Sequence, residues 1–263
     1  MTRRSALRCA QGGLSALGFT SLVTSSWFLP FPLTYLVLFD IDGTLLWSDG
    51  AGRRAMERAL TEVYGSAGDA GYRYDGKTDP QIVRELMRGV GHADERIDDG
   101  MERLLPLYLD GLRAELAEGT RDVRVLPGVP EVLDALEGRD DVVLGLLTGN
   151  LADGAAVKLG AAGIDIRRFR VSAFGSDHEH RPELPAVAVA RARAELGLDV
   201  AGERVVIVGD TPADIECGRG IGARAIAVAT GRYDVETLRA HGPAAVFESL
   251  ADTDAVVRAV VGG

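Results

Sequence analysis

Tyr35-Leu-Val-Leu-Phe39 leads directly into Asp40-Ile-Asp-Gly-Thr-Leu45, so that an apolar run ends in two carboxylates one residue apart. In an extended segment residues i and i+2 point to the same side, and Asp40 and Asp42 are therefore expected to converge on one spot. Two anions this close repel each other unless a cation or a shared proton compensates, which makes a divalent metal with oxygen ligands the natural partner. The plain alternative is a turn that ends a strand, since Asp and Gly are common turn formers.

Two other apolar runs of the chain end in polar loops that contain glycine. Residues 142–147 lead into Thr148-Gly-Asn150, and residues 204–208 lead into Gly209-Asp210-Thr-Pro-Ala-Asp214. Ligands of open parallel sheets bind beyond the carboxyl ends of the strands. Loops of matching chemistry at these strand ends favour one shared site over unrelated turns.

The pattern from Tyr35 onward, short Val, Ile and Leu runs alternating with helical stretches, is typical of a parallel sheet covered on both faces. It predicts an α/β fold, a Rossmann-like doubly wound parallel sheet. Strands are expected at residues 35–39, 142–147, 204–208 and 224–228, with weaker ones near 169–172 and 244–247. Helices are expected at residues 129–138, 152–162, 183–196, 212–220, 234–241 and 249–261.

About a hundred residues without a strand pattern separate the first strand from the second, far more than an ordinary crossover needs. Their apolar spacing is helical, and it predicts helices at 50–64, 79–89 and 94–118. We interpret residues 49–123 as an inserted α-helical cap domain, and residues 35–48 and 124–263 as the core. A lid over the site is favoured because such sites need water excluded during reaction. The alternative is a domain added for stability or association.

Composition excludes several classes of function. The chain of 263 residues has a formal net charge of -10 and contains no basic block, so we expect no nucleic-acid partner. No run of 18 or more apolar residues occurs, so we expect no membrane span. Cys9 and Cys217 cannot build a disulfide framework, and no His or Cys spacing suggests zinc.

Residues 1–34 differ from the rest of the chain. They contain Arg3, Arg4 and Arg8, and no acidic residue precedes Asp40. This profile loosely resembles a targeting segment, but we favour a disordered extension. We therefore expect a cytoplasmic protein, with organelle targeting or export as the alternative.

The three strand-end motifs together resemble those of the haloacid dehalogenase-like hydrolase superfamily, in its phosphoglycolate-phosphatase-like branch with a helical cap. The matching segments are Asp40–Leu45, Leu147–Asn150 and Val208–Asp214, and the resemblance covers nearly everything from Tyr35 to Val261. It implies a Mg2+-dependent phosphatase that acts on a small phosphorylated metabolite, such as phosphoglycolate or a sugar phosphate, as a monomer or homodimer.

Within this resemblance, Asp40 matches the nucleophile that forms an aspartyl-phosphate, and Asp42 matches the general acid and base. Dehalogenases of the superfamily lack the second acid, so Asp42 favours phosphate-ester cleavage. Asp210 and Asp214, together with Asp40 and the backbone carbonyl of Asp42, would hold Mg2+. The alternative for Asp214 is a favourable acid in the first turn of a helix.

The Thr148-Gly-Asn150 loop would bind phosphate through the hydroxyl of Thr148 and the backbone amides of Gly149 and Asn150, at the start of a helix. An ordinary helix cap by Asn150 is the alternative.

One departure from the family pattern concerns its usual active-site lysine. Arg181 stands at that position, and Lys158, on the helix after the threonine loop, competes as the source of the cation. In the cap, Lys77 is a candidate contact for an anionic group of the substrate. Two further readings remain open: a phosphomutase or phosphonate hydrolase on the same fold, and a non-catalytic phosphate-binding or receiver-like protein.

Overall fold

The computed structural model describes residues 34–117 and 123–262. The predictions for residues 1–34 therefore lie outside the described residues, apart from Thr34. Among the helices of the described residues, none combines the length and the apolar character needed to cross a lipid bilayer.

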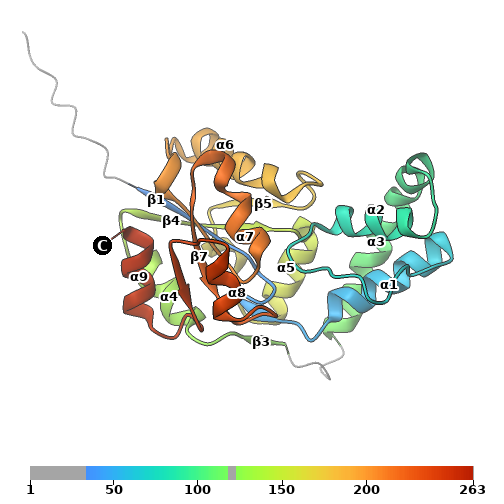
Figure 1. Ribbon diagram of the computed structural model, residues 1–263, viewed down its shortest axis with the longest axis horizontal. Coiled ribbons are helices and arrows are strands. Elements are labelled where there is room, and N and C mark those ends of the chain that lie inside the picture. The colour runs from blue at the N-terminus through green and yellow to red at the C-terminus, as the bar shows by residue number, and fades with distance from the viewer. Residues whose placement is uncertain (1–33, 118–122, 263) are drawn as a thin grey trace, which may run out of the picture. The chain divides into compact units, whose positions relative to one another are not determined.

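A parallel sheet forms the centre of the fold (Figure 1). Its order is β5-β4-β1-β6-β7-β8, and all neighbouring strands in it are parallel. The chain runs outward from β1 to β5 on one side and then from β6 to β8 on the other, so the carboxyl end of β1 lies at the switch point where ligands of such sheets bind. The strands span Tyr35–Phe39 (β1), Val142–Thr148 (β4), Val171–Phe174 (β5), Val205–Gly209 (β6), Arg224–Val228 (β7) and Ala245–Phe247 (β8).

Both faces of the sheet are buried, which explains the unbroken apolar sequence of β1. Val37 and Phe39 pack in one hydrophobic cluster, and Leu36 and Leu38 pack in another. Burying each such side chain stabilises the fold by about 1.5–3 kcal/mol. The first cluster includes residues of α4 (Val129–Glu137), α5 (Ala152–Ala161) and α9 (Thr253–Val261). On the opposite face lie α6 (Leu184–Leu196), α7 (Pro212–Cys217) and α8 (Val235–Ala240). The doubly wound α/β fold predicted from the sequence is confirmed.

Three helices follow the first strand: α1 (Ala51–Tyr64), α2 (Asp79–Gly89) and α3 (Asp94–Ala117). They share a hydrophobic cluster of their own, to which the core contributes Leu151. A short antiparallel ribbon of β2 (Leu46–Trp47) and β3 (Arg124–Val125) stands at the two ends of this helical segment. The boundaries drawn at residues 49 and 123 stay a prediction.

The elements differ from the sequence expectation mainly at their ends. Helix α9 begins at Thr253, not at 249, because the Asp252 side chain accepts a hydrogen bond from the amide of Ala255 and caps the helix there. Strand β5 begins at Val171, after a 3-10 turn at Ile166–Arg168. The ribbon of β2 and β3 was not expected, because strands of two residues carry no readable alternation.

Candidate active site

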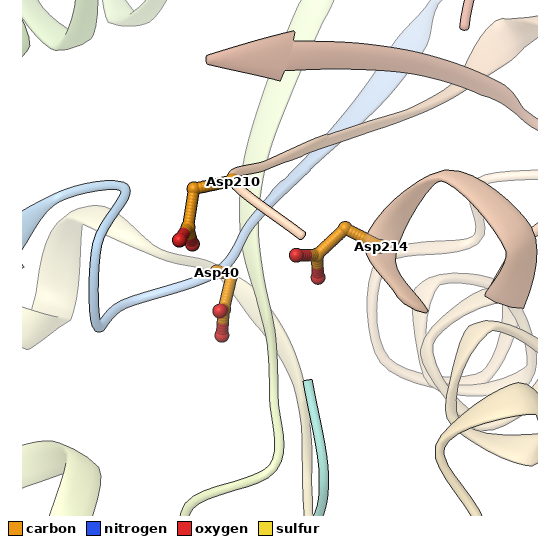
Figure 2. A group of neighbouring side chains, drawn as sticks. All are labelled: Asp40, Asp210 and Asp214. Atoms are coloured by element: carbon orange, nitrogen blue, oxygen red, sulfur yellow. The ribbon is translucent and has the colours of Figure 1, made fainter. Parts of the chain in front are cut away.

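Three carboxylates meet at the switch point of the sheet. Asp40 follows β1, Asp210 follows β6, and Asp214 lies in the first turn of α7. Each offers one carboxylate oxygen, and these oxygens lie within 4.8 Å of one another (Figure 2). All three residues are buried. This is the only such group of possible metal ligands among residues 34–117 and 123–262.

The group carries an electrostatic cost that a cation would relieve. Burial, followed by the charges of Asp214 and Asp42, raises the pKa of Asp40 to about 6, against the opposing effect of Arg181. Burial and the charges of Asp214 and Asp40 raise the pKa of Asp210 well above its ordinary value. Carboxylate oxygens are the ligands that Mg2+ prefers, so this donor set fits the predicted metal.

Two glycines keep space around Asp210. A Cβ atom on Gly43 would lie 2.4 Å from Asp210 Oδ2, and one on Gly231 would lie 1.7 Å from the same oxygen. The hydroxyl of Thr44 donates to Asp210 Oδ1 at 3.2 Å and holds the carboxylate in place. The Asp210 carboxylate therefore fits only because residues 43 and 231 have no side chains.

Asp214 has a structural task in addition to its place in the acidic group. Its Oδ2 accepts hydrogen bonds from the Thr211 amide at 2.9 Å and the Thr211 hydroxyl at 2.6 Å. The Asp214 amide donates in turn to the Thr211 hydroxyl oxygen at 3.3 Å, and this bond and the one from the Thr211 amide form a capping box at the start of α7. Its Oδ1 accepts a hydrogen bond from Arg181. Asp214 therefore both caps α7 and belongs to the acidic group, and each of its carboxylate oxygens accepts at least one hydrogen bond from the protein.

Arg181 is a buried cation at the first carboxylate. Its Nη2 lies 3.3 Å from Asp40 Oδ1, contacts Asp214 and donates to the backbone carbonyl of Leu147. Only 3% of the residue is exposed. The position that matches the family's lysine thus places a guanidinium beside Asp40.

Lys158 is a second buried cation, and it pairs with Asp42. Its Nζ donates to Asp42 Oδ2 at 2.6 Å and to Asn150 Oδ1 at 2.6 Å. Asp42 also accepts hydrogen bonds from the side-chain Nδ2 of Asn150 at 2.8 Å and from the Ser48 hydroxyl at 3.2 Å. Burial acts to raise the pKa of Asp42, but Lys158 and these hydrogen bonds outweigh it and hold the pKa below its ordinary value. Arg181 and Lys158, treated as alternatives in the sequence, are both brought to the site.

Asp40 and Asp42 line the same cavity but pair with different cations. The strand ends at Phe39, and the chain then turns so that the amide of Leu45 donates to the carbonyl of Ile41 at 2.9 Å. Gly43 adopts a φ of 82° in this turn. The two-residue period therefore breaks, and Asp42 stands with Lys158 while Asp40 stands in the acidic group.

Asn150 does not cap the helix that follows it. The cap residue of α5 is Leu151, without a side-chain hydrogen bond, and Asn150 turns toward Asp42, Lys158 and Thr148. The amide of Leu151 instead donates to Oδ2 of Asp79, the first residue of α2, at 2.9 Å. Sequence reasoning missed Asp79, because nothing local to it indicates a partner 72 residues away.

Asp79 is buried, and its carboxyl has an unusual pKa. Burial raises that pKa from 3.8 to about 6, although Lys158 and the Leu151 amide oppose the shift. Between these two pH values the folded protein binds more protons at Asp79 than the unfolded chain does. The contribution of Asp79 to the unfolding free energy therefore falls as pH rises through this window.

Asp79→Asn is accordingly expected to stabilise the protein in a pH-dependent way. Asn keeps an acceptor for the Leu151 amide and cannot ionise. The gain in unfolding free energy over wild type should be near zero at pH 4 and reach about 2–3 kcal/mol at pH 7.5. Urea unfolding followed by circular dichroism at both pH values measures it. A gain that is equal at the two pH values would contradict the assignment.

The segment Lys77–Asp79 docks on the threonine loop. The Asp79 amide donates to the carbonyl of Gly149 at 2.8 Å, and the Thr78 hydroxyl donates to the carbonyl of Glu179 at 2.5 Å. A Cβ atom on Gly149 would lie 2.0 Å from the carbonyl oxygen of Lys77. The helical segment and the loop predicted to bind phosphate can therefore meet only where residue 149 has no side chain.

Gly149→Ala is expected to destabilise the fold by about 1–3 kcal/mol, since the atom it would meet is backbone and cannot rotate away. Urea unfolding measures the loss. Gly160→Ala is the matched control: Gly160 lies in α5, where a Cβ would meet nothing within 4 Å. That variant should gain about 0.5–1 kcal/mol from helix propensity. Equal behaviour of the two variants would show that the contact at Gly149 is unimportant.

A cavity of about 190 Å³ opens beside these groups. Its wall includes Asp40, Asp42, Asp210, Thr148, Gly149, Asn150, Lys158 and Arg181, so it connects the acidic group with the threonine loop. Lys77 lines it as well, and the Nζ of Lys77 donates to Glu85 Oε2 at 2.5 Å and to the Tyr72 hydroxyl at 2.8 Å.

The chain matches known proteins over most of its length. Residues 182–253 match the HAD-hydrolase-like family. An N-acetylmuramic acid 6-phosphate phosphatase from Pseudomonas aeruginosa is 29% identical over 219 residues, which cover 80% of this chain and 88% of the relative. A phosphoglycolate phosphatase from Pseudomonas putida is 27% identical over 84% of this chain and 79% of the relative.

Solved structures share the fold. A hydrolase from Pseudomonas syringae has a TM-score of 0.65 at 23% identity, over 85% of this chain and 97% of that chain. CbbY from Rhodobacter sphaeroides, solved in complex with phosphate, has a TM-score of 0.62 at 21% identity, over 83% and 96%.

Proposed function

The chain belongs to the haloacid dehalogenase-like hydrolase superfamily, and we propose that it is a Mg2+-dependent phosphatase that hydrolyses a small phosphomonoester through an aspartyl-phosphate. One observation carries the proposal: Asp40 stands at the switch point of the sheet, 3.3 Å from Arg181 and beside the carboxylates of Asp210 and Asp214. The phosphatase names of the curated relatives support the same reaction class.

Asp40 and Asp210 would hold the metal together with the backbone carbonyl of Asp42. Asp214 would act through a water molecule, since both of its carboxylate oxygens already accept hydrogen bonds from the protein. Bound Mg2+ would neutralise charge on the phosphate and favour the ionised form of Asp40.

In the first step a carboxylate oxygen of Asp40 attacks phosphorus, and the bond from phosphorus to the ester oxygen breaks. The departing oxygen takes a proton from Asp42. Asp42 must therefore be protonated before this step, which Lys158 opposes. An incoming phosphate favours that protonation, because its negative charge raises the pKa of a nearby carboxyl and attracts Lys158.

In the second step water attacks the phosphorus of the aspartyl-phosphate while Asp42 accepts a proton from it. The bond between phosphorus and the Asp40 oxygen breaks, phosphate leaves, and Asp42 is again protonated. Thr148, Gly149 and Asn150 would bind the phosphoryl oxygens throughout, and Arg181 would hold the carboxylate of Asp40 in line.

The helical segment α1–α3 would act as a lid. Its contact at Gly149 would enclose the reacting groups, and enclosure excludes water that would compete with Asp40 for the phosphorus in the first step. The same contact would bring Lys77 and Asp79 to the cavity.

A phosphate-release assay over a panel of phosphomonoesters, with and without metal, tests the proposal. Removing divalent metal with a chelator is expected to lower the rate by about 10³-fold or more, and adding Mg2+ should restore it. Mg2+ should also raise the midpoint of thermal unfolding, because it would bind only the folded acidic group. Release of phosphate at full rate in the presence of the chelator would show that the reaction does not depend on a divalent metal. A stable phosphoprotein without released phosphate would favour the phosphate-binding alternative.

A further inference from the structure

Each cation that lines the cavity already has an acidic partner within 2.5–3.3 Å. The pairs are Arg53 with Glu57, Lys77 with Glu85, Lys158 with Asp42, Arg181 with Asp40, and Arg232 with Asp75. A carboxylate on a substrate would therefore find no cation without an acidic partner among the described residues of the wall. It would have to share a cation with an acid that is already paired with that cation, and the charge of this acid weakens the attraction.

The wall also contains an acid without such a partner. Asp79 lines the cavity, and its hydrogen bonds come from the Leu151 amide and, at 3.4 Å, from the Tyr108 hydroxyl. No ion pair involves Asp79 within the described part of the chain. A second carboxylate placed near it would be repelled, whereas a hydroxyl group could donate a hydrogen bond to it.

Tyr74 lines the same wall. Its oxygen is buried and has no hydrogen-bond partner among the described residues. The Arg53 guanidinium lies 4.8 Å from the centre of the Tyr74 ring, and Tyr72 meets the ring edge-on at 5.8 Å. The ring is thus held in place while its buried hydroxyl stays unpaired, an unfavourable state that a polar group of a ligand would end.

Apolar side chains complete this part of the cavity. The wall includes Trp47, Met56 and Ile82, together with the rings of Tyr74 and Tyr108. A wall of apolar side chains with a few polar groups suits a small molecule that carries both C–H surface and hydroxyls.

We propose that the group esterified to the phosphate is uncharged and bears hydroxyls, as in a sugar or polyol phosphate, and that Tyr74 and Asp79 select it against carboxylates. The proposal rests on the phosphatase function above and chooses between the two substrate classes that the sequence left open. Tyr74 donates to or accepts from a substrate hydroxyl, and Asp79 accepts from one.

A matched pair of substrates tests the selection. Glycerol 3-phosphate and 3-phosphoglycerate share a carbon skeleton and differ in a hydroxymethyl group against a carboxylate. With Mg2+ present, kcat/KM for glycerol 3-phosphate should exceed that for 3-phosphoglycerate by about tenfold or more. p-Nitrophenyl phosphate, which has no hydroxyl, reports the reaction itself.

Two variants test whether Tyr74 and Asp79 cause this substrate preference. Tyr74→Phe should lower kcat/KM for glycerol 3-phosphate by about tenfold and leave p-nitrophenyl phosphate within about twofold. Asp79→Asn should raise kcat/KM for 3-phosphoglycerate and thereby reduce the ratio of kcat/KM between the two substrates. Tyr64→Phe is the control, because Tyr64 is not among the residues of the cavity wall and its hydroxyl donates to the backbone carbonyl of Ile97. It should leave the ratio of the two substrates unchanged.

The outcomes separate the two proposals. If no ester is hydrolysed, p-nitrophenyl phosphate included, the phosphatase function fails and the selection fails with it. If p-nitrophenyl phosphate is hydrolysed but 3-phosphoglycerate is the equal or better of the matched pair, the function survives and the selection is wrong. A preference for the carboxylate that is lost in Lys77→Met would assign the contact to Lys77 instead.

Discussion

Asp40→Asn is expected to lower kcat for phosphomonoester hydrolysis by about 10⁴-fold or more. An amide oxygen is a poor nucleophile and cannot form the acyl phosphate, so the first step is lost while the shape of the site is kept. Rapid-quench and steady-state phosphate-release assays measure the loss.

The same variant should fold at least as well as wild type when metal is absent. Asp40 is one of three carboxylates within 4.8 Å, and Asn removes one negative charge from this group without changing its volume. Urea unfolding in a chelator provides the check. Full activity in Asp40→Asn would show that Asp40 is not the nucleophile. If Asp40→Asn does not fold, Asp40→Glu replaces it in the assay, because Glu keeps the negative charge but moves the carboxylate away from the phosphorus.

Arg181→Met is expected to destabilise the protein by about 3–5 kcal/mol in the absence of metal. The side chains of Arg181, Asp40 and Asp214 are 4%, 8% and 1% exposed. Removing the guanidinium therefore leaves two buried carboxylates without their cation. The loss should shrink when Mg2+ is present, because the metal would supply positive charge to the same group. Urea unfolding with chelator and with Mg2+ gives both values.

Two comparisons make the Arg181 experiment decisive. Arg181→Lys keeps the charge and loses the planar fork, so it should lie between wild type and Arg181→Met. Arg167→Met removes an arginine that is also paired with an aspartate, but Arg167 is 88% exposed, and no measurable change is expected. Equal unfolding midpoints for Arg181→Met and wild type would mean that the buried pair contributes nothing.

Much of the fold could be predicted because its signals are local. The apolar runs that became β1, β4, β6 and β7 were found to within one residue of their observed ends, since strands buried on both faces have continuous apolar sequence. The helices were found from their apolar spacing. The ends of α9 and β5 were placed less well, because a cap by Asp252 and a 3-10 turn before Val171 decide them.

The residues of the candidate site could be collected from the strand-end motifs, but their partners could not. From the sequence, Arg181 and Lys158 were alternative candidates for the cation of the active site. The structure brings Arg181 to Asp40 and Lys158 to Asp42, a pairing that no spacing along the sequence indicates.

The sequence by itself determined the doubly wound sheet, the helical segment after its first strand and the acids at the strand ends, because each is written in the spacing of neighbouring residues. Only the tertiary structure decided that Lys158 pairs with Asp42 across 116 residues and that Asp79 meets Leu151 across 72. It also decided that the Tyr74 hydroxyl has no hydrogen-bond partner among residues 34–117 and 123–262. Such contacts depend on how helices, strands and loops that are distant in sequence pack against one another. Sequence spacing along one helix or strand cannot encode that placement.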